Sequence, residues 1–172
     1  MIRKKQKFLI KPKIHIMKKE EFMQRAIDLS IEGSSKDKGG PFGAVVVKND
    51  KIVGESYNQV TSTNDPTAHA EVMAIRDACK NLKTFDLSGC ELYTSCEPCP
   101  MCLGAIYWAK FDKIYYGNSR KDAAKAGFND DFIYDEIPLP LSERKIKMVE
   151  IGQKEAQKAF RLWEEKMDRV AY

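Results

Sequence analysis

The stretches TAHAEVMAI (67–75) and TSCEPCPMCLGAIYW (94–108) decide the fold and raise the question of a metal site. The first stretch places His69, one of only two histidines in the chain, two residues before Glu71. The second stretch contains three of the five cysteines, each separated from the next by two residues: Cys96, Cys99 and Cys102. Imidazole and thiolate groups are ligands that zinc prefers. Together the two stretches therefore predict a zinc site.

Each candidate ligand is expected at the start of a helix. The residues after His69 and those after Cys99 have the periodicity of helices, and Cys99 and Cys102 are one turn apart on the same helix face. A helix N-terminus carries roughly half a positive charge, which favours a thiolate over a thiol. Two helix starts that converge would form a cation site with anionic ligands.

The number of zinc ligands distinguishes two kinds of site. Three protein ligands, His69, Cys99 and Cys102, leave the fourth position to water, as in a catalytic site. Cys96 as a fourth ligand would close a purely structural site. The structural alternative explains neither Glu71 nor the proline before Cys99, and we expect Cys96 to point elsewhere.

The order H-x-E followed by P-C-x-x-C is typical of zinc deaminases. Zinc lowers the pKa of a bound water to about 7, which supplies hydroxide at neutral pH. Glu71 is then expected to take the proton of this water and pass it to a ring nitrogen and the leaving amine. Without these neighbours, Glu71 would be read as an acid that complements a helix dipole.

The composition fits one folded domain of 172 residues. Hydrophobic residues make up 43% of the chain, and no apolar run approaches the ~20 residues of a membrane helix. The net charge of +4 depends on the leader 1–17, which contains no acid and six basic residues: Arg3, Lys4, Lys5, Lys7, Lys11 and Lys13. The remaining 18–172 have 23 basic against 25 acidic residues, so a basic groove for nucleic acid is not expected.

The leader has two readings. It is either a basic tail that binds polyanions or a poorly ordered extension upstream of a natural start at Met17, and we favour the extension. It lacks the apolar region and the cleavage site of a secretory signal. The odd, clustered cysteines indicate a reducing, cytoplasmic setting rather than a disulfide framework.

Periodicity and turn residues predict one domain over 18–172 in which an initial helix and a hairpin precede alternating helices and strands. The apolar side of the last helix is expected at Ala156, Ala159, Phe160, Trp163 and Met167. Between 122 and 145 we expect one short helix at most. Helices are expected over 18–32, 68–81, 98–110 and 153–167, a hairpin over 44–58, and strands over 90–95, 113–117 and 146–152. The order predicts a three-layer α/β/α fold with a mixed, about five-stranded sheet.

With these motifs the chain resembles the cytidine deaminase-like superfamily of zinc hydrolases. Four longer strings resemble the bacterial guanine deaminases within it, and the likeness runs from Glu21 to Tyr172. The strings are GGPFGAVVVK (39–48), TSTNDPTAHAE (61–71), YTSCEPCPMCLGAIYWA (93–109) and DAAKAGFNDDFIY (122–134). The resemblance implies hydrolysis of guanine to xanthine and ammonia, with zinc hydroxide attacking C2, one zinc per subunit on His69, Cys99 and Cys102, and Glu71 as proton shuttle.

The resemblance also implies three purine-binding residues. Asn58 would hold the polar edge of the base, Phe42 would stack on its face, and Asp130 would contact the ring and take part in catalysis. On the sequence alone, Asn58 is a strand-end turn residue, Phe42 is equally well a core residue, and Asp130 is a solvated loop acid. Asn129 departs from the family, which often has an aspartate before Asp130.

The last residue and two further positions complete the expected site. Tyr172 matches a terminal tyrosine that closes the pocket and takes part in catalysis, although a chain end usually frays. Similar enzymes exchange the C-terminal segment between subunits, which implies a domain-swapped homodimer in which Tyr172 serves the partner. We also expect Ala70 and Trp108 to contact the purine.

Three alternative functions stay open. A tRNA adenosine deaminase would share the metal motif but would need a basic surface for RNA. A nucleoside deaminase acting on guanosine or cytidine would need space for a ribose, which the sequence does not measure. A non-enzymatic zinc module would need His69 and the cysteines but not Glu71.

Overall fold

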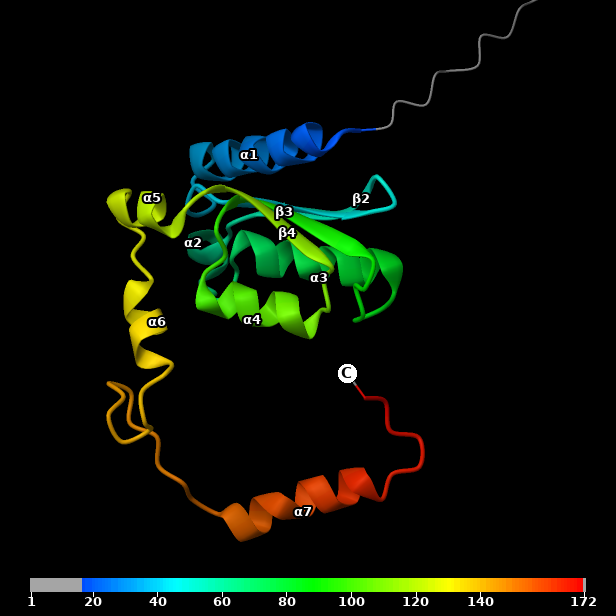
Figure 1. Ribbon diagram of the computed structural model, residues 1–172, viewed down its shortest axis with the longest axis vertical. Helices are drawn as coiled ribbons and strands as arrows, with labels where there is room; N and C mark the ends of the chain where they lie inside the picture. Colours follow the sequence, from blue (N-terminus) through cyan, green and yellow to red (C-terminus); the bar gives the residue numbers. More distant parts are fainter. Residues whose placement is uncertain (1–16, 172) are drawn as a thin grey trace, which may run out of the picture.

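The computed structural model of the chain describes residues 17–171, in which a four-stranded sheet lies between two layers of helices (Figure 1). Helix α1 covers one face of the sheet, and α3 and α4 cover the other. The strands are β1 (Gly43–Lys48), β2 (Lys51–Tyr57), β3 (Cys90–Cys96) and β4 (Lys113–Asn118), in the order β2-β1-β3-β4. Because β1 is antiparallel to β2 and β3 while β4 is parallel to β3, the sheet is mixed, as predicted.

The expected hairpin is present. Its turn residues Asn49 and Asp50 have φ values of 51° and 57°, in the left-handed region that a two-residue type I′ turn requires. Asparagine and aspartate tolerate this conformation better than other non-glycine residues. The turn fixes the pairing of β1 with β2.

Helix α1 (Lys19–Ser35) packs through one apolar stripe. Phe22, Ala26 and Leu29 recur at helical spacing and are buried against Val45 and Tyr93 of the sheet. The rings of Phe22 and Tyr93 lie 5.3 Å apart between centroids. Burial of this stripe holds α1 across the middle of the sheet.

On the opposite face, α3 (Ala70–Leu82) approaches the sheet closely because its inner residues are small. Ala74 and Ala78 are fully buried, and a Cβ atom at Gly54 of β2 would lie 2.5 Å from the backbone nitrogen of Ala78. Glycine is therefore required at position 54. Ile106 of α4 (Pro100–Trp108) joins the same core.

Two predicted helix starts were wrong, and the correction bears on the site. Helix α3 begins at Ala70 with His69 as its N-cap, whereas Thr67 turns its hydroxyl to Asp65. Helix α4 begins at Pro100 rather than at residue 98. Its N-cap is Cys99, so that each helix starts directly after a candidate ligand.

The short helix α2 (Val60–Thr63) lies between the hairpin and α3, where no helix was predicted.

The C-terminal third differs most from the prediction. Two short helices, α5 (Arg120–Lys125) and α6 (Asp131–Glu136), are present where one at most was expected. Residues 146–152 form no strand, so the described chain has four strands instead of five.

Helix α7 (Gln153–Glu164) stands apart from the α/β body (Figure 1). The residues of its predicted apolar stripe are exposed: Phe160 by 71%, Trp163 by 43%, and Met167 beyond the helix fully. The helix therefore has an apolar surface that nothing covers among residues 17–171. None of the described helices is long and apolar enough to cross a membrane. The basic leader lies outside the described residues except for Met17.

Candidate zinc and substrate site

The N-termini of α3 and α4 bring the three predicted zinc ligands together. His69 is the N-cap of α3, Cys99 is the N-cap of α4, and Cys102 lies in the first turn of α4. The Nδ1 atom of His69 lies 3.5 Å from each of the two sulfurs. All three donor atoms lie within 4.8 Å of one another.

This spacing fits one zinc ion. Zinc binds nitrogen at about 2.1 Å and sulfur at about 2.3 Å. In a tetrahedral site, a nitrogen and a sulfur on the same ion are therefore about 3.6 Å apart. The observed separations of 3.5 Å agree with this value. One imidazole and two thiols also form the donor set that zinc prefers, so His69, Cys99 and Cys102 would hold the metal.

Hydrogen bonds among these donors move their pKa values. The hydrogen bond from the Cys102 thiol, aided by one from His69, lowers the pKa of Cys99 to about 4. The same pairing and burial raise the pKa of Cys102, and the hydrogen bond to Cys99 raises the pKa of His69. The pocket thus favours a thiolate at Cys99, and binding of a divalent cation would displace the remaining protons.

Glu71 lies beside the donors without being one of them. It is only 6% exposed and follows His69 by two residues in the first turn of α3. The sulfur of Cys102 lies 3.5 Å from its Oε2, and the hydroxyl of Thr94 on β3 donates to its Oε1 at 3.4 Å. Burial raises the pKa of Glu71, so this carboxyl binds a proton more readily than an exposed one.

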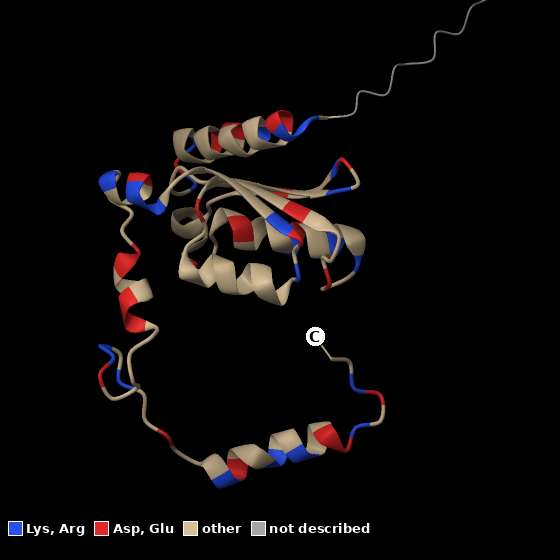
Figure 2. Ribbon diagram, in the orientation of Figure 1, with Lys and Arg blue, Asp and Glu red and all other residues tan. Residues whose placement is uncertain are grey.

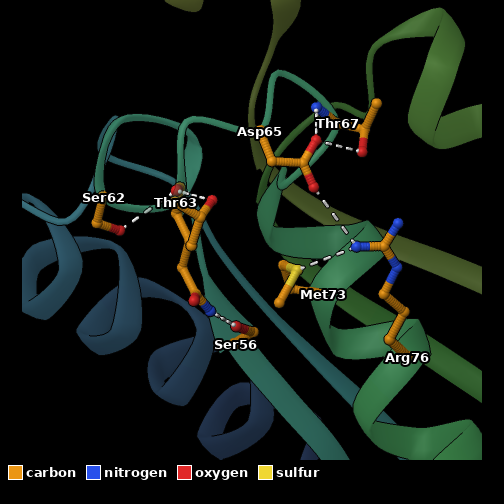
Figure 3. Close-up of polar contacts among 8 residues, drawn as sticks. Ser56, Ser62, Thr63, Asp65, Thr67, Met73 and Arg76 are labelled. Atoms are coloured by element: carbon orange, nitrogen blue, oxygen red, sulfur yellow. Dashed lines mark hydrogen bonds and ion pairs between the residues drawn. The ribbon is translucent and has the colours of Figure 1, made fainter.

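The loop before α3 is fixed by a small polar network (Figure 3). The Oδ1 atom of Asp65 accepts hydrogen bonds from the backbone nitrogen and the hydroxyl of Thr67, at 2.8 and 2.7 Å. Its Oδ2 lies 3.8 Å from Arg76 on α3, and Arg76 in turn contacts the sulfur of Met73. The network ties both ends of the turn that presents His69.

A cavity of about 390 Å³ opens directly over the donors. Its size is typical of a small-molecule site. Predicted site residues that line it are His69, Glu71, Cys99, Asn58, Phe42 and Asp130. The structure therefore brings together around one cavity residues that are up to 88 positions apart in the chain.

Asn58 enters this cavity in one fixed orientation. Its side-chain oxygen accepts hydrogen bonds from the backbone nitrogens of Gly40 and Val60, at 3.2 and 3.1 Å. A Cβ atom at position 39 would lie 2.3 Å from that oxygen, so only glycine permits this approach. No acceptor among residues 17–171 bonds the amide nitrogen. Asn58 can therefore donate a hydrogen bond to a ligand through its amide nitrogen, while its oxygen is already used. The sequence alone did not indicate which of the two amide atoms would face the ligand.

The aromatic wall consists of two rings rather than one. Phe42 lines the cavity as predicted, and Phe128 meets it edge to face, with centroids 4.9 Å apart and planes at 83°. Sequence reasoning missed Phe128, although it lies two residues before Asp130 in a string that was singled out. An apolar residue next to a candidate ligand-binding acid was the signal for it.

Asp130 lines the cavity, is half-buried and lies directly before α6. Burial raises its pKa. The neighbouring Asn129 turns its side-chain oxygen to the backbone nitrogen of Asp131 at 2.9 Å. The departure from aspartate at position 129 therefore retains an acceptor at the start of α6 while removing a charge from the rim.

Three predicted residues are not brought into this cavity. Trp108 is 67% exposed at the end of α4, and Ala70 is fully buried behind His69. Neither lines the cavity of a single chain, and their contact with a purine stays a prediction. Tyr172 lies outside the described residues.

Cys96 is not placed as a ligand. Its sulfur points to the backbone oxygen of Ser119, at 3.7 Å, and it is absent from the cluster of donors. The cavity is also lined by Glu97 and Arg120, which sequence reasoning missed. Charged residues of both types are common at protein surfaces, so no pattern in the chain indicated them.

Fold, donor set and adjacent buried carboxylate define a zinc-dependent deaminase domain. A family model described as the cytidine and deoxycytidylate deaminase zinc-binding region matches residues 16–118, more than half of the chain. The chain belongs to this family.

Two comparisons extend beyond the zinc-binding region. Guanine deaminase of Bacillus subtilis (strain 168) is 51% identical over 156 residues, which cover 91% of this chain and 100% of that protein. A crystal structure of guanine deaminase from Bacillus subtilis matches with a TM-score of 0.88 and 51% identity, over 91% of this chain and 99% of that one.

A third relative matches over a shorter length. A tRNA-specific adenosine deaminase of Buchnera aphidicola subsp. Schizaphis graminum is 39% identical over 108 residues, 63% of this chain and 68% of that protein.

Proposed function

We propose that this protein is a zinc-dependent guanine deaminase, which hydrolyses guanine to xanthine and ammonia. The observation that carries the proposal is the similarity to Bacillus subtilis guanine deaminase, which covers the whole of that protein at 51% identity. The similarity includes the segment after residue 118, which lies beyond the zinc-binding region and carries Phe128 and Asp130. This segment forms one wall of the cavity.

The residues around the cavity can perform this reaction. When bound, zinc supplies a water activated as a nucleophile at neutral pH. Glu71 would take one proton of that water and deliver it to a ring nitrogen. It would then carry the second proton of the added oxygen to the amine, which leaves as ammonia; the raised pKa of its buried carboxyl favours this proton binding. Bulk water has little access to this carboxyl, because Glu71 is only 6% exposed.

The substrate groups are matched by type. The amide nitrogen of Asn58 donates to an acceptor on the edge of the base, and the carboxylate of Asp130 accepts from a ring N–H. Phe42 and Phe128 contact the flat apolar surface of the purine. Ala70 does not line the cavity of a single chain, so we propose no contact between Ala70 and the purine.

The net charge of 18–172 and the length of the similarity to guanine deaminase both favour guanine over the rival substrates. The near-neutral body of 18–172 does not provide the basic surface that tRNA binding requires. The tRNA adenosine deaminase match covers 63% of the chain, against 91% for guanine deaminase. Five free cysteines support a reducing cytoplasm as the setting, and guanine as substrate supports a place in purine metabolism.

We also propose that the enzyme is a homodimer. The exposed apolar surface of helix α4 supports this proposal. The helix carries no charged residue, so its ribbon is tan throughout in Figure 2. Tyr107 and Trp108 are 76% and 67% exposed on it. A helix that is apolar all round is normally buried, and a second copy would bury this one. Trp108 would then reach a site only from the partner.

Exchange of the C-terminal segment accounts for two further unpaired surfaces. Strand β4 is an edge strand, with unused backbone groups on its outer side. Four of the six residues in 146–151 are apolar and exposed: Ile146, Met148, Val149 and Ile151. If this segment added to β4 of the partner, it would supply the fifth strand that the sequence predicts, and it would carry α7 and Tyr172 to the partner's cavity.

The function is tested by ammonia release from a panel of substrates. Purified full-length protein is incubated with guanine, guanosine, adenine, cytosine and cytidine, and zinc is measured in the same samples. Guanine should be the preferred substrate, with about one zinc per chain. Preference for guanosine or cytidine would establish a nucleoside deaminase, and loaded protein without ammonia release from any compound would indicate a non-enzymatic zinc module.

A further inference from the structure

One wall of the cavity is a separate segment of chain. Residues 120–136 contain α5, α6 and the loop between them, and they supply Phe128 and Asp130 to the cavity. In Figure 1 this segment lies at one end of the sheet, beyond the end of β4. It contributes no buried residue to the main core, so its position depends on specific contacts.

Those contacts reach the loop that precedes the zinc ligand Cys99. The backbone nitrogen of Arg120 donates to the carboxylate of Glu97 at 3.0 Å. The hydroxyl of Tyr134 on α6 donates to the backbone oxygen of Pro98 at 3.3 Å. The segment is therefore fastened at both of its ends to the two residues before Cys99.

The Arg120 side chain joins these two ends. Its guanidinium carbon lies 4.6 Å from the centre of the Tyr134 ring, and its Nε lies 3.9 Å from the carboxylate of Asp131. Arginine over an aromatic ring is held by cation–π attraction. The stacked guanidinium limits the rotation of Tyr134 away from Pro98.

We infer that Tyr134 is a positioning residue for purine binding, which Arg120 holds in place, and that the pair fixes the wall carrying Phe128 and Asp130 relative to the zinc loop. The inference rests on the proposed function. Tyr134 does not line the cavity and therefore acts without touching the purine, whereas Arg120 lines the cavity and also stacks on Tyr134. Pro98 itself is buried and bonded through its backbone, so the anchor on the zinc loop does not depend on a side chain.

A wall held by this pair contacts the purine equally before and during the reaction. Its loosening should therefore raise KM for guanine and leave kcat nearly unchanged. Loss of one hydrogen bond corresponds to a change of about 3- to 10-fold. A residue that only stabilised the fold would lower the melting temperature without a selective change in KM.

The test uses Tyr134→Phe, which removes only the hydroxyl, and Arg120→Gln, which keeps the backbone bond to Glu97. Each variant should show about a 3- to 10-fold higher KM for guanine, kcat within about twofold of wild type, and full zinc content. Since both act through one contact, the double variant should raise KM less than the product of the single effects. Tyr115→Phe removes the same atom, with its hydrogen bond to Glu91, on the α1 face of the sheet and should leave KM unchanged.

An unchanged KM in both variants, or multiplicative effects in the double variant, would overturn the inference. A variant that loses zinc would also overturn it, because the pair would then support the metal rather than the purine wall. Absence of ammonia release from guanine by the wild-type chain would refute the proposed function instead. The two failures are therefore distinguishable.

Discussion

The carboxylate of Glu71 and the sulfur of Cys102 lie 3.5 Å apart, although they belong to different helices. Both are buried, and both lie in the first turn of their helix. The contact shows that the two helix starts converge on one point, where the proposed proton carrier lies next to a proposed metal ligand.

Replacement of single cysteines by serine should distinguish the proposed zinc ligand Cys102 from the nearby Cys96. Cys102→Ser should abolish stoichiometric zinc binding, because its sulfur is one of the three clustered donors. Cys96→Ser is the matched control and should keep about one zinc per chain, because that sulfur points to Ser119. Metal analysis of both variants checks this. Zinc lost from Cys96→Ser but kept by Cys102→Ser would reassign the third ligand.

The fixed orientation of Asn58 predicts different outcomes for two substitutions. Asn58→Asp keeps an oxygen for the backbone nitrogens of Gly40 and Val60 but loses the donor to the purine. It should raise KM for guanine at least about tenfold with little change in melting temperature. Asn58→Ala should raise KM and also lower the melting temperature by removing both loop bonds. Equal KM for wild type and Asn58→Asp would show that the amide nitrogen does not bind substrate.

Stability of the metal-free protein should depend on pH through Glu71. Burial raises the pKa of Glu71 in the folded state above its unfolded value of about 4.3. The contribution of this carboxyl to the stability of the folded protein is therefore fully present below the unfolded pKa. It is lost as the pH rises through the raised folded-state pKa. Glu71→Gln should therefore melt higher than wild type at pH 8, with a difference that shrinks towards pH 4.

Thermal unfolding of metal-free samples between pH 4 and pH 8 measures this difference. Glu32→Gln on the exposed side of α1 is the matched control and should show little effect at any pH. A metal-free wild type that is more stable than Glu71→Gln at pH 8 would contradict the burial argument.

Exchange of the C-terminal segment predicts complementation between two inactive variants. Glu71→Gln lacks the proton carrier, and Tyr172→Ala lacks the residue proposed to close the partner's site. In a mixed dimer, the intact tail of the first chain would serve the intact Glu71 of the second. Equal amounts, refolded together, should regain about a quarter of wild-type turnover, since half of the dimers are mixed and each has one complete site.

Native mass spectrometry confirms that mixed dimers form in this experiment. If they form without any recovery of turnover, each tail serves its own chain. If Tyr172→Ala alone is as fast as wild type, the terminal tyrosine has no part in catalysis.

Much of the fold was predictable because local rules decide it. The hairpin follows from Asn49 and Asp50, whose side chains tolerate positive φ. The stripe of Phe22, Ala26 and Leu29 identified α1. The metal site was predictable for a similar reason: Cys99 and Cys102 are local to each other, as are His69 and Glu71, and only the convergence of the two helix starts is tertiary.

The rest depended on contacts between distant segments. The sequence does not indicate that the oxygen of Asn58 is used by Gly40 and Val60, because that bond needs a loop folded over the strand end. Phe128 and Arg120 came into the site only through the placement of α5 and α6. The fifth strand is absent for a comparable reason, since a strand forms only by pairing, and 146–151 pair with no strand of the described chain.

The most direct measurement is ammonia release from guanine by wild type and Glu71→Gln, with zinc determined in the same samples. The account predicts about one zinc per chain in both, an unchanged fold, and a kcat lower by roughly 10²- to 10⁴-fold in the variant. Glu32→Gln should match wild type. Near-normal turnover in zinc-loaded Glu71→Gln, or loss of zinc together with activity, would contradict the role of Glu71 as the proton carrier beside the metal.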